Sequence, residues 1–159
     1  MRIRERRHRD IVNSEIVARR DEQPESAILL LQRATHVTLD ALSKRLAHLR
    51  LTPGEVNVLA NLVDGEERTV SELSRQVGTP LTTMTSMLDR LVRRDLITRH
   101  TPESNRRTVV ISLTPTGHRI ATEVRDAISA LEVELTADLT TRQLAGLRQT
   151  LELLGRPRR

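Results

Sequence analysis

Helix starts are clearly marked in this chain, because Thr is followed directly by Pro at four places. A Thr side chain can accept a hydrogen bond from a free N–H group in the first turn of a helix, and Pro suits the first helical position because it has no N–H group to leave unpaired. Three of the pairs are therefore predicted to open helices, and three Thr residues also begin capping-box patterns. The pairs are Thr52-Pro53, Thr79-Pro80 and Thr114-Pro115, and the capping boxes begin at Thr52, Thr69 and Thr140.

Apolar residues recur between these signals with a period of about 3.6 residues, which predicts a mainly α-helical protein. Between Leu96 and Leu113 the period changes to two, and a polar, turn-forming stretch at 102–107 interrupts it. This segment is therefore predicted to be a small antiparallel β-hairpin with a cationic tip. The predicted helices span about residues 25–48, 53–63, 70–77, 80–94, 115 onward and 141–154, and the predicted strands span 97–101 and 108–113.

Aromatic residues and cysteine are absent from all 159 residues. Without a thiol the chain cannot form a disulfide, a cysteine-ligated zinc site, an iron–sulfur cluster or a thiol redox sensor. Without aromatic rings, recognition of single-stranded nucleic acid by base stacking loses its main source of binding energy. The longest apolar run, 27–31, is far shorter than the roughly 20 residues of a membrane-spanning helix, and no signal-peptide core follows the basic N-terminus. The sequence therefore predicts a soluble, cytoplasmic protein.

The segments 70–77 and 80–94, separated by a turn at Gly78, have the outline of a helix-turn-helix, in which the second helix enters the major groove of DNA. One side of this second helix is predicted to be buried, because four apolar residues fall within about 80° of its circumference. The opposite side carries hydroxyl groups, which can read base edges, followed by arginines, which can bind phosphates. The apolar residues are Leu81, Met84, Leu88 and Leu91, the predicted base contacts are Thr82, Thr83 and Ser86, and the predicted phosphate contacts are Arg90 and Arg93.

Arg106 and Arg107 lie at the tip of the predicted hairpin, which follows the predicted recognition helix. A hairpin in this position is the wing of a winged helix, and the negative potential of a narrow minor groove attracts inserted arginines. The charge distribution points the same way, since residues 68–107 hold eight arginines and four acidic residues in a chain with a net charge of +5. A merely solvated helix could show the same polar face, but the cationic hairpin beside it favours DNA binding.

One pattern in the sequence combines three stretches with a hairpin signature that follows them. The stretches are 71–85, Asp89-Arg90-Leu91 and 93–99. That signature consists of Arg99, Asn105, Arg106, Arg107, Leu113-Thr114 and Gly117. Together they resemble the MarR (multiple-antibiotic-resistance regulator) family. The chain departs from the family at two positions, because Asn105 stands where the family usually has Asp and Asp95 stands where it usually has Gly. An amide cannot form the ion pair with a wing arginine that a carboxylate would, and Asp adopts the left-handed conformation less readily than Gly.

The resemblance covers about residues 25–154 and implies a winged helix-turn-helix protein with N- and C-terminal dimerisation helices. Such a protein is a homodimeric repressor or activator that binds double-stranded DNA at a pseudo-palindromic operator. The helices outside the DNA-binding region also carry more apolar surface than that region can cover, which favours a two-fold dimer over an intramolecular bundle. The predicted parts are a basic N-terminal extension at 1–24, a helical dimerisation region at 25–50 and 115–156, and a winged helix-turn-helix region at 51–114.

The resemblance further implies a small effector, commonly a phenolic or other aromatic acid, bound between the dimer helices and the winged helix. Arg33, His36 and Arg50 could face such a cleft, but ordinary salt bridging explains the arginines equally well, so no effector-binding residue is assigned. The extension at 1–24 could be a basic arm, an extra helix or a solvated tail, and it is assigned no role.

Catalysis has no positive support in the sequence. The five His residues are scattered without a close metal-ligand pair, and there is no Gly-rich phosphate loop and no nucleophile elbow. The sequence therefore predicts no enzyme activity, no cofactor and no metal site. Two further interpretations stay open: a winged-helix adaptor that binds another protein, and an architectural DNA-binding protein without sequence preference.

Overall fold

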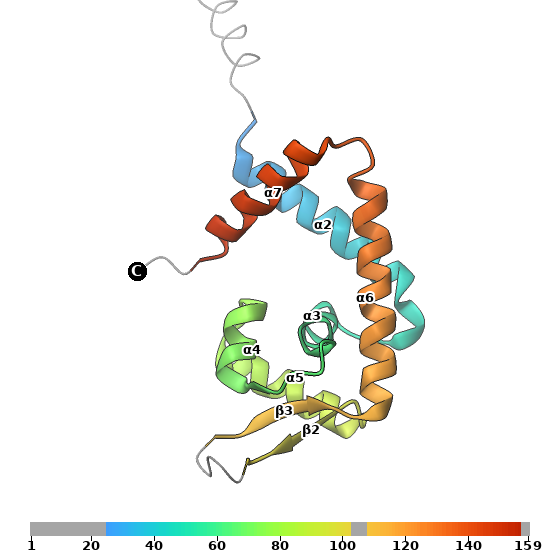
Figure 1. The fold of residues 1–159 in the computed structure, drawn as a ribbon, viewed down its shortest axis with the longest axis vertical. Coiled ribbons are helices and arrows are strands. Elements are labelled where there is room, and N and C mark those ends of the chain that lie inside the picture. Colours follow the sequence, from blue (N-terminus) through green and yellow to red (C-terminus); the bar gives the residue numbers. More distant parts are fainter. Residues whose placement is uncertain (1–24, 103–107, 157–159) are drawn as a thin grey trace, which may run out of the picture. The chain divides into compact units, whose positions relative to one another are not determined.

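The structure, a computed structural model, describes residues 25–102 and 108–156. Over these ranges the chain is mainly helical, with a small three-stranded antiparallel sheet, so the fold class predicted from the sequence is confirmed (Figure 1). No helix within the described ranges is long and apolar enough to span a membrane. The elements are α2 (Ala27–Arg45), η1 (Ala47–Leu49), α3 (Pro53–Leu62), β1 (Arg68–Thr69), α4 (Val70–Val77), α5 (Leu81–Arg93), β2 (Ile97–His100), β3 (Val110–Leu113), α6 (Pro115–Leu135) and α7 (Thr141–Leu154).

The chain divides into two units, residues 1–37 and 38–159. Of the first unit, the structure describes residues 25–37, which contain the first part of α2 and an ion pair between Arg33 and Glu25. The second unit contains the remainder of α2 and all the later elements. The hydrophobic core and the candidate site both lie in this second unit.

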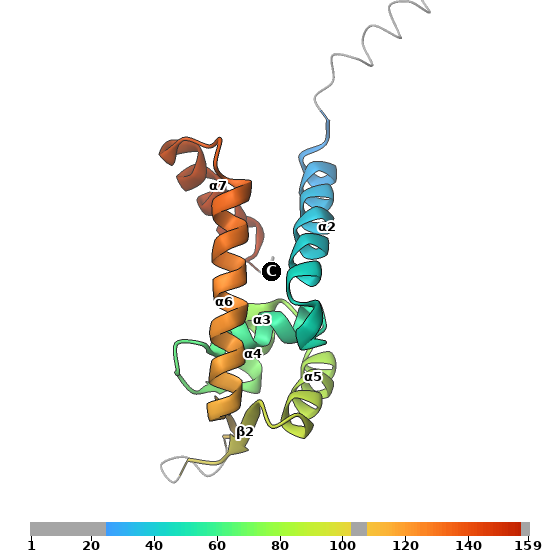
Figure 2. The same ribbon diagram turned by 90° about the vertical axis from the view of Figure 1, so that its right-hand side faces the viewer.

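An aliphatic core joins α3, α4, α5, the start of α6 and the sheet. Within it, α3 packs against α6, and α4 packs against α5 (Figures 1 and 2). Because the chain has no aromatic residue, branched aliphatic side chains and methionines fill this space. The buried residues of the core are Val58, Leu59, Leu62, Leu73, Met84, Met87, Leu88, Leu91, Leu96, Ile97, Ile111 and Ala121.

The helix starts follow the predicted capping signals at all but one site. Thr52, Thr69 and Thr140 each accept a hydrogen bond from the backbone three residues later, and all three capping boxes are formed. The pair Thr79-Pro80 is the exception, since Pro80 is the N-cap of α5 and no side chain caps that helix. The hydroxyl of Ser74 instead donates to the carbonyl of Thr79, so the hydrogen bond at this turn comes from α4.

Thr114 joins the start of α6 to the turn that follows α5. Its hydroxyl accepts a hydrogen bond from the backbone N–H of Gly117 at 2.9 Å and donates one to the carbonyl of Asp95 at 2.7 Å. Gly117 packs so closely on this turn that a Cβ atom there would lie 1.7 Å from the carbonyl oxygen of Leu96. Only a glycine fits this contact.

The predicted hairpin is present and belongs to a larger sheet. β2 and β3 pair antiparallel, with Ile97 opposite Leu113 and His100 opposite Val110. β1 pairs with the other edge of β3, which gives the order β1-β3-β2. The sequence analysis did not predict β1, because two residues are too few to show an alternating pattern.

The first predicted helix is too long. α2 ends at Arg45, and the chain continues through η1 to Arg50, whose φ of 50° is left-handed. The backbone N–H of Arg50 donates to the carbonyl of Ala47, which closes this turn. We call residues 46–52, between α2 and α3, the connector.

Candidate nucleic-acid interface

A tight turn sets the geometry of the helix-turn-helix. α4 ends at Gly78, whose φ of 68° is left-handed and whose N–H donates to the carbonyl of Ser74. The N–H of Thr79 donates to the same carbonyl at 3.0 Å. A residue with a Cβ would be strained at this φ, so Gly78 allows α4 and α5 to be joined by only three residues, 78–80.

The buried side of α5 is close to the predicted one, with one correction. Met84, Leu88 and Leu91 are fully buried, as predicted, and Met87 is buried with them. Leu81 is 52% exposed, so its predicted place in the core is wrong. Leu81 is the first residue of α5, and burial on this side of the helix begins only at Met84.

The hydroxyl residues predicted to read bases all lie on the exposed surface of α5. Thr82, Thr83 and Ser86 are exposed. The Ser86 hydroxyl donates to the carbonyl of Thr82 at 3.3 Å. Because this bond uses the hydroxyl proton of Ser86, its oxygen lone pairs stay available to accept from a base.

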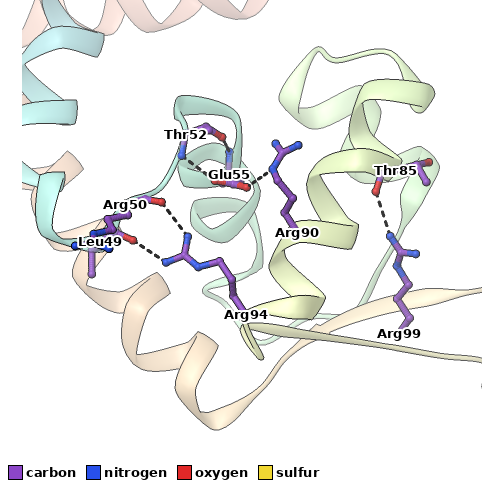
Figure 3. Close-up of polar contacts among 8 residues, drawn as sticks. All are labelled: Leu49, Arg50, Thr52, Glu55, Thr85, Arg90, Arg94 and Arg99. Atoms are coloured by element: carbon purple, nitrogen blue, oxygen red, sulfur yellow. Dashed lines mark hydrogen bonds and ion pairs between the residues drawn. The ribbon is translucent and has the colours of Figure 1, made fainter.

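Arg90 lies beside a buried carboxylate that the sequence analysis did not single out. Its Nε donates to Oε1 of Glu55 at 2.8 Å, and the Arg90 side chain remains 41% exposed (Figure 3). Glu55 is 3% exposed and also accepts from the backbone N–H of Thr52 at 2.8 Å. Burial raises the pKa of Glu55, but hydrogen bonds from Thr52 and Arg90 outweigh it, and the net pKa lies below the ordinary value. The pair is therefore charged at neutral pH.

Arg93 and Arg94 are adjacent in sequence and both exposed, but they differ in their hydrogen bonds. Arg93, a predicted phosphate contact, is exposed at the end of α5. Arg94 donates from Nη2 to the carbonyl of Leu49 at 2.7 Å and from Nη1 to the carbonyl of Arg50 at 3.0 Å (Figure 3). Sequence reasoning missed this role, because the residues are more than 40 positions apart and nothing local marks the contact.

A second arginine outside the predicted set ties β2 to α5. Arg99 pairs with Asp89 at 2.8 Å. It also donates to the carbonyl of Thr85 at 3.3 Å (Figure 3). The Arg99 side chain is 31% exposed, so solvent screens this pair only in part. The contact fixes the first strand of the hairpin against α5.

The other predicted DNA contacts, Arg106 and Arg107, lie outside the described residues, as do Asn105 and the extension at 1–24. Asp95, the second departure from the family pattern, has a left-handed φ of 55°. Within the described ranges no group of three or more His, Cys, Asp or Glu side chains could hold a metal ion.

Comparisons with known proteins agree with this geometry. Residues 51–109 match the MarR family. No curated protein sequence matches the chain.

Three solved structures are similar to the whole fold. A mutant of MarR from E. coli, complexed with operator DNA, is 27% identical, with 79% of this chain and 90% of that one covered and a TM-score of 0.67. CouR, a transcriptional repressor bound to a 23-mer DNA duplex, is 25% identical. The match covers 82% of this chain and 93% of CouR, with a TM-score of 0.71. BpsR from Bordetella bronchiseptica, whose DNA binding is regulated by 6-hydroxynicotinic acid, is 19% identical and shares the fold. The match covers 84% of this chain and 96% of BpsR, with a TM-score of 0.73.

Proposed function

Since this chain is a MarR family winged helix-turn-helix protein, matched over residues 51–109, we propose that it is a homodimeric transcriptional regulator that binds a specific operator sequence. The observation that carries the proposal is the exposed hydroxyl surface of α5, opposite a side that is buried in the core. Only the exposed side of such a helix is free to enter a major groove.

In this proposal each surface residue has a defined partner on the duplex. Thr82, Thr83 and Ser86 contact base edges, because hydroxyl groups both donate and accept and a Thr methyl can pack on thymine. Arg93 and the terminal nitrogens of Arg90 contact phosphates. Arg106 and Arg107 enter the adjacent minor groove from the hairpin tip.

Exposed apolar side chains on α7 support the homodimer. No residue of α7 is buried, although the helix carries five leucines. Four of them are more than 40% exposed: Leu147, Leu151, Leu153 and Leu154. Burial against a second copy would remove this surface from water, and a two-fold dimer would place two recognition helices about 34–36 Å apart, one turn of DNA.

The regulatory part of the proposal is a repressor released by a small aromatic or phenolic acid. The similar fold of BpsR, whose DNA binding responds to 6-hydroxynicotinic acid, supports this class of effector. A pocket in this chain would recognise the acid with aliphatic walls and a cationic group, because the sequence has no Phe, Tyr or Trp. Titrating such acids into the protein–DNA complex tests this part directly, and release of the DNA at saturating effector is expected.

The test of the proposed function begins with a duplex selected by the purified protein from a random library. We expect the protein to prefer this duplex to a random one by roughly 10³-fold or more. Arg107→Ala should weaken binding and lower the slope of log Kd against log salt concentration. The slope should fall by about 0.9 for each phosphate that the variant no longer neutralises. Ser86→Ala should change the preference among selected sequences while leaving the salt dependence unchanged.

Arg142→Ala is the control for charge, because Arg142 is an exposed arginine at the start of α7. Equal affinity for selected and random duplexes would identify an architectural DNA-binding protein instead. Absence of binding even at low salt would favour a protein-binding adaptor. Ser86→Ala and Arg107→Ala proteins that bind as the parent does would refute the site assignment.

A further inference from the structure

Two arginines at the C-terminal end of α5, four residues apart, contact residues within the connector at 46–52 or just after it. Arg90 leaves α5 toward Glu55 at the start of α3, and Arg94 leaves the end of α5 toward Leu49 and Arg50 (Figure 3). Residues four apart lie on the same face of a helix. Both side chains therefore join one face of the end of α5 to residues 49–55.

Arg94 occupies both terminal nitrogens in these contacts. The carbonyls that it meets belong to Leu49, the last residue of the short 3-10 helix, and to the left-handed residue Arg50, where backbone acceptors lack helical partners. A planar guanidinium can bond two neighbouring carbonyls at once, whereas an ammonium group acts as a single point of charge. Arg94 thus directs both terminal nitrogens to these carbonyls and uses two of its five N–H donors there, whereas no such contact engages Arg93 among the described residues.

The carboxylate of Glu55 holds the other end of the connector. One of its oxygens accepts from the backbone N–H of Thr52 at 2.8 Å, and the other accepts from Arg90 at 2.8 Å. This carboxylate is buried and charged, so it fixes the last residue of the connector and α5 to each other. The connector is thus attached to α5 at 49–50 by Arg94 and at Thr52 by Glu55 and Arg90.

We propose that Arg94 is a positioning residue for DNA recognition: it holds the end of α5 to the connector and so couples the orientation of α2 to that of the recognition helix. The inference rests on the proposed function, since it presupposes operator binding. α2 runs directly into the connector, so a change in the direction of α2 reaches α5 through the two carbonyls that Arg94 binds. Arg94 acts without touching DNA.

The test compares Arg94→Gln with Arg93→Gln, a matched substitution of the neighbouring arginine. Binding of each protein to the selected duplex and to a random duplex is measured across a range of salt concentrations. For Arg93→Gln we expect the slope of log Kd against log salt to fall by about 0.9 for each phosphate that is left without its cation. For Arg94→Gln we expect about tenfold weaker binding to the selected duplex with the slope unchanged, and unchanged binding to the random duplex.

Arg94→Lys separates charge from geometry and serves as a second variant if Arg94→Gln folds poorly. It keeps the positive charge but cannot bond both carbonyls as a guanidinium does, so we expect it to reduce the preference for the selected duplex by about as much as Arg94→Gln does. Full rescue by Lys, a lowered salt slope for Arg94→Gln, or parental binding by Arg94→Gln would each overturn the inference. A parent protein that shows no preference between the two duplexes would overturn the proposed function itself, and this inference with it.

Discussion

Replacing Gly117 with Ala is expected to destabilise the protein, although Ala is normally the better helix former. The added Cβ would lie 1.7 Å from the carbonyl oxygen of Leu96, whereas real Cβ contacts stay beyond 3.0 Å. The atom in the way is backbone, and it accepts the hydrogen bond from the N–H of Thr114 at 3.1 Å, so it cannot move without breaking that bond. Gly117→Ala therefore pushes the start of α6 away from the turn between α5 and β2.

The magnitude follows from three contributions. Overpacking of a tight site costs about 1–3 kcal/mol, and a weakened hydrogen bond costs about 1 kcal/mol more. Improved helix propensity returns up to about 1 kcal/mol. The net loss is about 2 kcal/mol, which lowers the melting temperature of a domain of this size by roughly 4–8 °C.

Thermal unfolding followed by circular dichroism measures this effect. Gly146→Ala, in the middle of α7, is the matched control, because a Cβ there meets nothing within 4 Å. At equal protein concentration we expect Gly146→Ala to melt at the parental temperature or slightly above it. A Gly117→Ala protein that melted with or above the parent would refute the reasoning, because it would show that the turn at Leu96 yields without cost.

Two other predictions concern acid stability and assembly. A hydrogen bond from Arg68 lowers the pKa of Asp64 from 3.8 to about 2, so this pair stabilises the folded state above about pH 4 and its contribution is lost as the pH falls through about 2. Because the Asp64 side chain is 48% exposed, solvent screening limits this contribution to less than about 1 kcal/mol. In urea unfolding, the Asp64→Asn protein should therefore lose less stability between about pH 5 and about pH 2 than the parent does. The same loss of stability in both proteins would contradict this prediction. Leu151→Glu on α7 should convert the dimer to monomers in analytical ultracentrifugation, whereas Gln149→Glu on the same helix should not, and a dimeric Leu151→Glu protein would place the interface elsewhere.

Local signals in the sequence were sufficient for most elements of the fold. The bounds of α4 and α7 match the predicted 70–77 and 141–154, because a capping box opens each helix and a glycine follows each end. The hairpin was predicted from its change of period. The turn at Gly78 follows from the same kind of local rule, because glycine adopts a left-handed φ without strain.

Contacts between distant parts of the chain could not be predicted in the same way. Glu55 and Arg90 are 35 positions apart, and a capping box explains a Glu at that position without any partner on α5. Leu81 fits the apolar stripe of α5 by angle, but its burial depends on how far the core extends along the helix, which the stripe does not report. The carbonyls that Arg94 binds carry no sequence signal, since every residue has one.

The order of strands in the sheet has a consequence for solubility. β3 lies in the centre and is paired on both sides, while β1 has only two residues, so the longest open edge among the described strands is that of β2. An unpaired strand edge invites a strand from another molecule, and native proteins discourage such pairing with short strands and charged side chains. β2 has four residues, and one of them is the ion-paired Arg99. We therefore expect the arginine that fixes the hairpin to α5 also to discourage strand addition from another molecule at this edge.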